Sequence, residues 1–341
     1  MREFTVALPQ RNTHVLFFPR MAEDILMVEE SSALLVFDTN TENLFPDKPF
    51  PHYTIPAGEQ FKCWDTIRDL SAWALEQGAG RDITFIAVGG GVVCDMTAFL
   101  ASVFMRGTGL VLVPSTLLAM VDAALGGKTG IDFEGYKNIL GTFFPAREVR
   151  VFPRLLESLP EREYLGGLAE AIKHGLLMDN DLFGLLKNQR KAVLRRDPET
   201  INEVIYRSVQ VKKWFIEEDP YENDIRGHLN LGHTFAHALE THGGFSKWTH
   251  GEAVAWGIDK AMKAGVMIGL TDPGYAEEVH QLLREYGFGL DIEVKDPEAL
   301  IMAMKNDKKK KSGKVRFILQ KRQGDTRYAD LPGEILRRVI V

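Results

Sequence analysis

The sequence predicts an N-terminal α/β domain followed by a mostly α-helical C-terminal domain. Two observations support this prediction. Up to about residue 150, short continuous apolar runs alternate with helix-like segments, and from about residue 155 onward helical periodicity dominates. We therefore expect two domains, at residues 1–155 and 156–341, and the chain length of 341 residues agrees with that number.

Three short apolar runs in the N-terminal part predict β-strands. Residues 33–37 stop at Asp38, residues 83–88 stop at three glycines, and residues 110–113 stop at a proline. Continuous apolar runs of this length are typical of strands buried on both faces. Between the first two runs, residues 64–77 carry apolar side chains near helical spacing, so we expect a parallel sheet with helical connections.

The C-terminal part predicts helices and one late strand. Prolines stand near the expected starts of three helices, as is common at the first helical position. The expected helices cover residues 161–178, 181–195, 199–219, 229–242, 251–269, 273–286 and 297–305, and the expected strand covers residues 315–319. A run of four lysines from Lys308 is the only low-complexity segment.

Composition excludes several classes of protein. The chain is 45% hydrophobic and 26% charged, which is typical of a globular protein with a sizeable core. Its net charge of −6 argues against binding to nucleic acid or to an anionic membrane. Cys63 and Cys94 cannot form a disulfide framework. With no signal-like N-terminus and no apolar run of about 18 residues, we expect a soluble cytoplasmic protein.

The strongest local signal is the turn Gly89–Gly91, between the second strand and a helix expected to run through Met105. Glycines at such a turn let the backbone approach a phosphate at the helix N-terminus, although the same residues also suit a tight turn. Asp38, at the end of the first strand, stands where dinucleotide-binding proteins hold a ribose. An ordinary turn aspartate is the alternative interpretation.

Histidines are dense in the second half of the chain. Five of the nine histidines lie between residues 228 and 250: His228, His233, His237, His242 and His250. His233 and His237 share one face of a helix. Such a group suits a divalent metal that is completed by a carboxylate, but the spacing decides neither which histidines are ligands nor which carboxylate joins them.

Several basic residues stand beside glycines or apolar segments and point to an anionic ligand. They are Arg106, Lys128, Lys137 and Lys173. Phosphate and carboxylate groups need paired donors of this kind. Each residue alone could equally be a solvated charge.

Seven separated segments, taken in order, resemble 3-dehydroquinate synthases, members of the sugar phosphate cyclases. The resemblance covers roughly residues 33–319, and the first thirty residues carry none of it. The segments are 55–62 (IPAGEQFK), 89–95 (GGGVVCD), 114–132 (PSTLLAMVDAALGGKTGID), 135–145 (GYKNILGTFFP), 168–175 (LAEAIKHG), 229–240 (LNLGHTFAHALE) and 250–257 (HGEAVAWG).

The resemblance implies a Rossmann-like NAD-binding domain followed by a helical metal- and substrate-binding domain, a homodimer, and a divalent metal, zinc or alternatively cobalt. The implied metal ligands are Glu170, His233 and His250. The implied NAD-binding residues are Asp38, Asn40, Glu59, Lys62, Gly90, Gly91, Val92, Asp95, Ser115, Thr116, Lys128, Lys137, Ser158 and Glu163. The implied catalytic and substrate-binding residues are Arg106, Asp122, Lys128, Lys137, Asn138, Lys173, Arg226, Asn230, His237 and one of Lys308 and Lys309.

The implied reaction converts an anionic sugar phosphate, 3-deoxy-D-arabino-heptulosonate 7-phosphate, to 3-dehydroquinate and phosphate. In the family it proceeds by transient oxidation with NAD, β-elimination of phosphate, reduction and an intramolecular aldol step in the shikimate pathway of aromatic amino acid biosynthesis. Another sugar phosphate cyclase, a metal-dependent alcohol or glycerol dehydrogenase of the same fold, and an inactive regulatory paralogue are the alternatives.

A few positions depart from the family pattern. Cys94 stands where glycine is usual, Ser115 and Ser158 stand where threonine is common, and Ala123-Ala124 replace two serines. Serine keeps the hydroxyl of threonine, whereas Cys94 adds a side chain at the glycine turn. None of these departures removes a charged residue that is expected to contact substrate.

Overall fold

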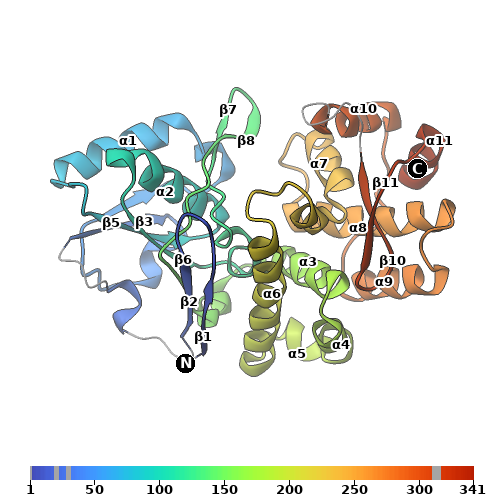
Figure 1. Cartoon of the computed structure of the whole chain (residues 1–341), viewed down its shortest axis with the longest axis horizontal. Coiled ribbons are helices and arrows are strands. Elements are labelled where there is room, and N and C mark those ends of the chain that lie inside the picture. The colour runs from blue at the N-terminus through green and yellow to red at the C-terminus, as the bar shows by residue number, and fades with distance from the viewer. Residues whose placement is uncertain (1, 19–22, 28–31, 309–315) are drawn as a thin grey trace. The chain divides into compact units, whose positions relative to one another are not determined.

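A computed structural model describes residues 2–18, 23–27, 32–308 and 316–341 (Figure 1). The chain divides into two compact units, the first formed by residues 1–159 with 212–221 and the second by residues 160–211 with 222–341. The main boundary lies four residues after the expected one, and a ten-residue segment from the helical part joins the first unit.

The first unit contains a seven-stranded sheet of the kind the apolar runs predict. Its strand order is β1-β2-β9-β6-β5-β3-β4, and every neighbouring pair is parallel except β1 and β2. The strands are β1 (Arg2–Val6), β2 (Thr13–Phe17), β3 (Ala33–Asp38), β4 (His52–Ile55), β5 (Thr84–Gly89), β6 (Gly109–Pro114) and β9 (Glu148–Val151). The three predicted strands are β3, β5 and β6, and they lie side by side in the middle of the sheet.

The strand order contains a topological switch point. Strand β3 pairs with β4 on one side and with β5 on the other. The chain leaves the carboxyl end of β3 toward β4 and the carboxyl end of β5 toward β6, in opposite directions. Such a switch point is where α/β proteins bind ligands. Two helices and a hairpin complete this unit: α1 (Trp64–Glu76), α2 (Gly91–Val103), β7 (Ile131–Phe133) and β8 (Tyr136–Leu140).

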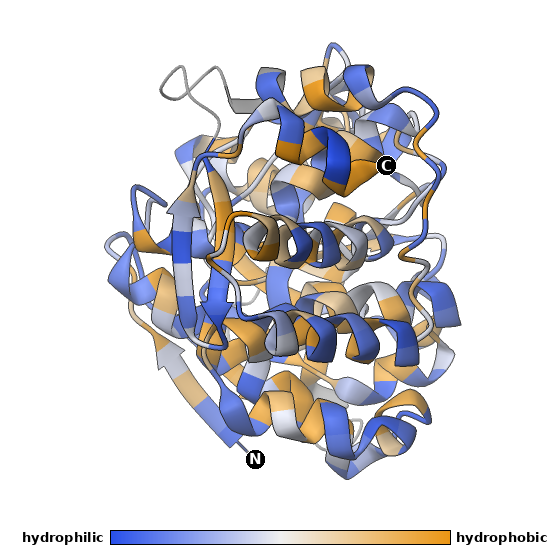
Figure 2. Cartoon of the chain, turned by 90° about the vertical axis from the view of Figure 1, so that its right-hand side faces the viewer, coloured by the Kyte–Doolittle hydropathy of each residue, from blue (hydrophilic) through white to orange (hydrophobic). Residues whose placement is uncertain are grey.

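The second unit is mostly helical, as predicted. Its helices are α3 (Glu161–Leu177), α4 (Asn180–Asn188), α5 (Arg190–Leu194), α6 (Pro198–Glu218, whose last residues belong to the first unit), α7 (His233–His242), α8 (His250–Met267), α9 (Pro273–Glu285), α10 (Pro297–Lys308) and α11 (Gly333–Ile340). Figure 2 shows hydrophobic and hydrophilic residues on different sides of these helices. Helix α9 buries an apolar face and exposes the opposite face, whereas α3 and α8 are buried along most of their length.

Two helix boundaries differ from the prediction. The helix expected at residues 181–195 is two helices that meet at Gln189. The helix expected at residues 229–242 begins only at His233, because Gly232 has a φ of +80°. A left-handed residue cannot continue a right-handed helix.

A small hairpin caps the end of α3. Strands β10 (Phe317–Arg322) and β11 (Asp325–Ala329) form it, and β10 corresponds to the late strand that the sequence predicts. The fully buried Gln320 donates from Nε2 to the carbonyl of Leu176 at 2.9 Å, and its Oε1 accepts from the Tyr275 hydroxyl at 2.9 Å. Carbonyls in the last helical turn lack partners within the helix, and that of Leu176 accepts both from this side chain and from the backbone N–H of Gly324 at 3.0 Å.

In the part of the chain that the structure describes, no helix combines the length and the apolar character that crossing a membrane requires.

We expect the Gln320→Leu substitution to lower the free energy of unfolding by about 2–3 kcal/mol, because it leaves the buried Tyr275 hydroxyl without its acceptor. Gln323, which is less buried and donates to the carbonyl of Gly175 at 2.8 Å, is the matched control. Its change to leucine should cost about 1 kcal/mol. Urea unfolding of both variants measures the difference, and equal losses would contradict the role given to Gln320.

Candidate active site

Three neighbouring strand ends of the first unit bring polar groups to one edge of the sheet. Asp38 ends β3, the glycine turn follows β5, and Ser115 and Thr116 follow β6. The Asp38 Oδ1 atom accepts from the backbone N–H groups of Asn40 at 3.0 Å and Thr41 at 2.9 Å. These hydrogen bonds fix the carboxylate through Oδ1, and Oδ2 takes no part in them.

The glycine turn approaches its neighbours closely. Gly90 precedes α2, and an added Cβ at Gly90 would lie 3.1 Å from Cγ2 of Thr116. A side chain at Gly90 would therefore crowd Thr116 and cover the first N–H groups of α2. These N–H groups are the natural partners of an anion. The neighbouring Gly91 and Val92 stand in the same first turn and are half-buried.

Cys94 lies in the first turns of α2, directly after the glycine turn. Its side chain is buried, and its thiol lies 3.7 Å from the carbonyl oxygen of Gly89. Burial raises the pKa of the Cys94 thiol, so it stays neutral. Substitution of glycine by cysteine at this position therefore fills core space and leaves the exposed backbone of the turn in place.

A buried ion pair ties the hairpin β7–β8 to the start of α2. The Nζ atom of Lys62, only 4% exposed, donates to Asp95 Oδ2 at 2.6 Å and to Asn138 Oδ1 at 2.5 Å. Burial opposes the charge, but the carboxylate of Asp95 raises the pKa of Lys62, which therefore stays cationic. Beside them, Lys137 and Glu59 form a partly exposed ion pair of 3.6 Å. The structure thus brings together five of the residues that the family resemblance implies: Glu59, Lys62, Asp95, Lys137 and Asn138.

Asp122 lies in a π-helical turn, Ala119–Ala123. Such turns are rare and often occur at functional sites. The buried Lys212 donates to Asp122 Oδ1 at 2.6 Å and also contacts the Asp122 carbonyl. The sequence analysis missed Lys212, because one of two adjacent lysines within a helix looks like a solvated charge. Ala124 is buried and Ala123 half-buried in the same turn.

Three further residues of the first unit belong to the set that the family resemblance implies, and one of them, Lys128, lines a small cavity together with Asp95 and Ala123. Arg106 is exposed in the turn after α2, and its backbone has the left-handed conformation with a φ of +67°. Lys128 is exposed. The hydroxyl of Ser158 donates to the carbonyl of Leu155 at 3.3 Å. Some of the residues that the family resemblance implies are therefore held in clusters, whereas Arg106 and Lys128 are exposed.

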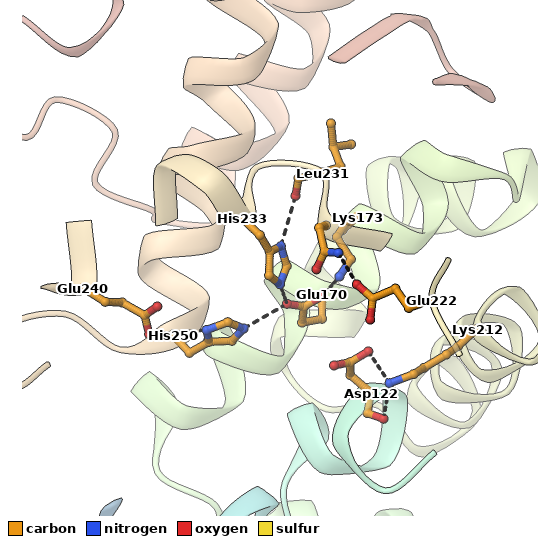
Figure 3. A network of polar contacts seen from close by, with 10 residues as sticks. Asp122, Glu170, Lys173, Lys212, Glu222, Leu231, His233, Glu240 and His250 are labelled. Carbon is orange, nitrogen blue, oxygen red and sulfur yellow. Dashed lines mark hydrogen bonds and ion pairs between the residues drawn. The ribbon is translucent and has the colours of Figure 1, made fainter. Parts of the chain in front are cut away.

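Three side chains from different helices converge in the second unit (Figure 3). Glu170 comes from α3, His233 begins α7 and His250 begins α8. Their donor atoms lie within 4.8 Å of one another. The Nε2 atom of His250 is 3.2 Å from Glu170 Oε1, and the Nε2 atom of His233 is 3.5 Å from the same oxygen.

Local sequence fixes where these histidines stand. Thr249 and Glu252 form a reciprocal capping box that starts α8 at His250. The left-handed Gly232 starts α7 at His233. Each ligand candidate is thus held at a helix start whose position the adjacent residue determines.

The donor set fits a divalent metal. Two ligands at about 2.1 Å from a tetrahedral ion lie about 3.4 Å apart, close to the 3.2 and 3.5 Å separations found here. Burial and Lys173 lower the pKa of His233 well below its usual value, so this imidazole is neutral. Burial works against charging of His250, but hydrogen bonds to Glu170 and Glu240 raise its pKa to about 10. A metal must therefore displace a proton from His250.

Two buried groups surround the three ligand candidates. Lys173, three residues after Glu170 on α3, forms an ion pair with its carboxylate. Burial opposes ionisation, but Lys173 and His250 hold the pKa of Glu170 well below its usual value. Glu240 lies 3.4 Å from Nδ1 of His250 and orients its ring, as carboxylates often do for metal-bound histidines. The sequence analysis missed Glu240, although it stands two turns after His233 on α7.

The loop before α7 carries two further residues of the implied set. Arg226 is 2% exposed, and Asn230 donates to Glu222 Oε1 at 2.7 Å. Tyr328 of β11 holds this loop by donating to the carbonyl of Asp224 at 2.7 Å. His228 packs against the ring of Tyr328, with ring centroids 5.0 Å apart, and is not part of the metal cluster.

The remaining implied residues of this unit are placed as follows. The ring of His237 lies 5.5 Å from that of His233, measured between centroids. Glu163 is exposed in the first turn of α3. Lys308 is the last residue of α10, and Lys309 lies outside the described residues.

The fold defines the class of protein. A solved structure with a TM-score of 0.89 is a 2-epi-5-epi-valiolone synthase from Streptomyces hygroscopicus subsp. jinggangensis with NAD+ and Zn2+ bound, 26% identical over 98% of this chain and 97% of that one. A probable glycerol dehydrogenase from Sinorhizobium meliloti shares the fold with a TM-score of 0.68 at 15% identity, over 97% of this chain and 95% of that one. The fold is therefore that of sugar phosphate cyclases, and dehydrogenases also use it.

Sequence comparison gives the family. The family descriptions that match are 3-dehydroquinate synthase N-terminal over residues 52–166 and 3-dehydroquinate synthase C-terminal over residues 167–310. A 3-dehydroquinate synthase of Acidithiobacillus ferrooxidans is 37% identical over 98% of this chain and 95% of its own. One of Solibacter usitatus is 40% identical over 81% of this chain and 78% of its own. The chain belongs to the 3-dehydroquinate synthase family.

We expect the Glu240→Gln substitution to weaken metal binding roughly 10–100-fold, because an amide is a poorer partner than a carboxylate for the ring of a metal-bound histidine. The zinc dissociation constant, measured by chelator competition, checks this. His250→Ala, which removes a ligand candidate itself, should abolish stoichiometric zinc. Glu240→Gln with unchanged affinity would show that Glu240 does not support the site.

Proposed function

We propose that this protein acts as a 3-dehydroquinate synthase, a carbon–oxygen lyase that converts 3-deoxy-D-arabino-heptulosonate 7-phosphate to 3-dehydroquinate and phosphate. The observation that carries the proposal is the buried cluster of Glu170, His233 and His250 in a chain of this family. The same membership leads us to propose a homodimer that serves the shikimate pathway.

The cofactors that we propose are NAD and one zinc ion. Asp38, the glycine turn and Thr116 line the switch point of the sheet, where a dinucleotide is expected to bind. When bound, NAD would take up and return a hydride. Zinc, held by Glu170, His233 and His250, would lower the pKa of a substrate hydroxyl and polarise a carbonyl.

The basic residues supply charge for an anionic substrate. Arg226 and Lys173 are almost fully buried, so their charges are weakly screened and act strongly on a phosphate or carboxylate. Asn230 is held by Glu222 with its amide oriented. These residues bind and orient the substrate, and positioning of this kind supports a reaction of several steps on one molecule.

His237 is the residue that we assign to proton transfer. It lies one helical turn after His233 and is half-buried, and the three-donor cluster does not include it. An imidazole that is not a ligand can serve as a general acid or base. Its backbone carbonyl accepts from the Thr241 hydroxyl at 2.8 Å, which ties this turn of α7 together.

We expect NAD to support turnover far better than NADP, because the Asp38 carboxylate would accept from ribose hydroxyls and repel a 2′-phosphate. In Asp38→Asn the amide oxygen can still accept from Thr41 and keep the turn, but the charge is lost. The preference for NAD, measured as the ratio of kcat/KM values, should then fall about tenfold or more. An equal preference in the parent protein and the variant would exclude this role.

A second experiment separates the synthase from a dehydrogenase of the same fold. With heptulosonate phosphate as substrate, NAD far below the substrate concentration should support complete phosphate release. Absorbance at about 340 nm, the NADH band, should stay flat because the hydride returns to the same molecule. If NADH accumulated in step with substrate consumption, the dehydrogenase assignment would be correct. Absence of both phosphate and NADH would favour an inactive paralogue.

A further inference from the structure

Each ligand candidate of the metal cluster stands beside a glycine on its own chain segment. Glu170 follows Gly166 by one turn of α3, His250 directly precedes Gly251 on α8, and His233 directly follows Gly232. All of these residues belong to the second unit.

At the crossing of α3 and α8 the two backbones touch. A Cβ atom added to Gly251 would lie 2.2 Å from the Cα atom of Gly166 and 2.3 Å from its carbonyl oxygen. Helices that pack through larger side chains stand 8–10 Å apart between axes. Any side chain at position 251 would collide with the backbone of α3, so only glycine allows α3 and α8 to come this close. This contact lies one residue from His250.

The backbones of α7 and α8 also approach each other closely, at Gly257. A Cβ atom added to Gly257 on α8 would lie 2.2 Å from the carbonyl oxygen of Gly232 and 3.1 Å from the backbone nitrogen of Ala236. Gly232 itself is left-handed and starts α7 at His233. The backbone of α8 is therefore pressed against α3 at Gly251 and against the start of α7 at Gly257.

We propose that Gly251 and Gly257 are positioning residues that set the distances between the three metal ligands. The inference rests on the metal site proposed above. Metal sites work only when their ligands are held within about 0.5 Å of the productive geometry. The 3.2 Å separation of His250 Nε2 from Glu170 Oε1 bridges α8 and α3, and the two glycine contacts fix those helices to each other and to α7.

The same helices provide matched controls. A Cβ atom on Gly166, on the opposite side of the first crossing, would have its nearest neighbours 3.9 Å away at Gly251, so alanine fits there. A Cβ atom on Gly265 of α8 would lie 1.8 Å from Oγ1 of Thr271. Gly265 lies 15 residues after His250, about 22 Å along the helix. Each Gly→Ala change adds the same methyl group to a residue of a helix, so the variants differ in what that methyl group contacts.

The experiment uses the full chain, stripped of metal and titrated with Co2+ alone. Visible absorption of bound Co2+ reports ligand geometry, and chelator competition gives the dissociation constant. We expect Gly251→Ala and Gly257→Ala to change the Co2+ spectrum and to weaken binding roughly 10–100-fold. Gly166→Ala should leave both unchanged. Gly265→Ala should lower the melting temperature but keep the parent spectrum.

Several results would overturn the inference. One is a parent-like spectrum and affinity in folded Gly251→Ala and Gly257→Ala. Another is failure of both variants to fold while Gly265→Ala folds, because the contacts would then serve the whole unit rather than the ligands. Failure of the parent protein to bind Co2+ would instead refute the metal site itself, and the inference with it. Far-ultraviolet circular dichroism separates these outcomes.

Discussion

The fully buried carboxylate of Glu170 is the constraint on which the second unit depends. A carboxylate with no exposed surface is costly unless positive charge and hydrogen bonds surround it. Lys173 supplies one cation from the same helix, and His250, with its pKa raised to about 10 despite burial, supplies another through its contact with Glu170. A divalent metal would replace the proton on His250 with a stronger counter-charge. The helices α3, α7 and α8 are therefore packed around a charge that only a cation can stabilise.

The first unit depends on a different constraint, the backbone at the ends of its parallel strands. Asp38 is fixed by its own turn, and the glycine turn needs residues without side chains beside Thr116. The ion pair of Lys62 and Asp95 extends this order to the hairpin β7–β8, because Lys62 also binds Asn138 and its carbonyl accepts from the backbone of Asp132 at 2.7 Å. A single buried lysine thus connects the glycine-turn helix to the hairpin that carries Lys137 and Asn138.

Sequence patterns predicted those parts of the fold that produce strong local signals. Strands β3, β5 and β6 are continuous apolar runs, and the long helices α3 and α8 were also predicted. Strand β1 was not, because it is short and only Val6 in it is fully buried. The histidine cluster indicated a metal, but periodicity could not separate His250 from His228, which instead packs on Tyr328. Lys212 and Glu240 were missed, because their partners lie 90 and 10 residues away and only the tertiary fold brings them together.

The arrangement of the histidines explains why packing between helices matters so much here. His233 and His237 have the i, i+4 spacing with which one helix can supply two ligands to a metal, and such a pair needs no neighbouring helix to fix its distance. In this chain the second imidazole of the cluster is His250 instead, which begins a different helix. The distance between the two imidazoles of the cluster therefore depends on the distance between α7 and α8. A site divided among three helices has ligand distances that depend on how those helices pack, and here α8 approaches α3 and the start of α7 backbone to backbone at Gly251 and Gly257.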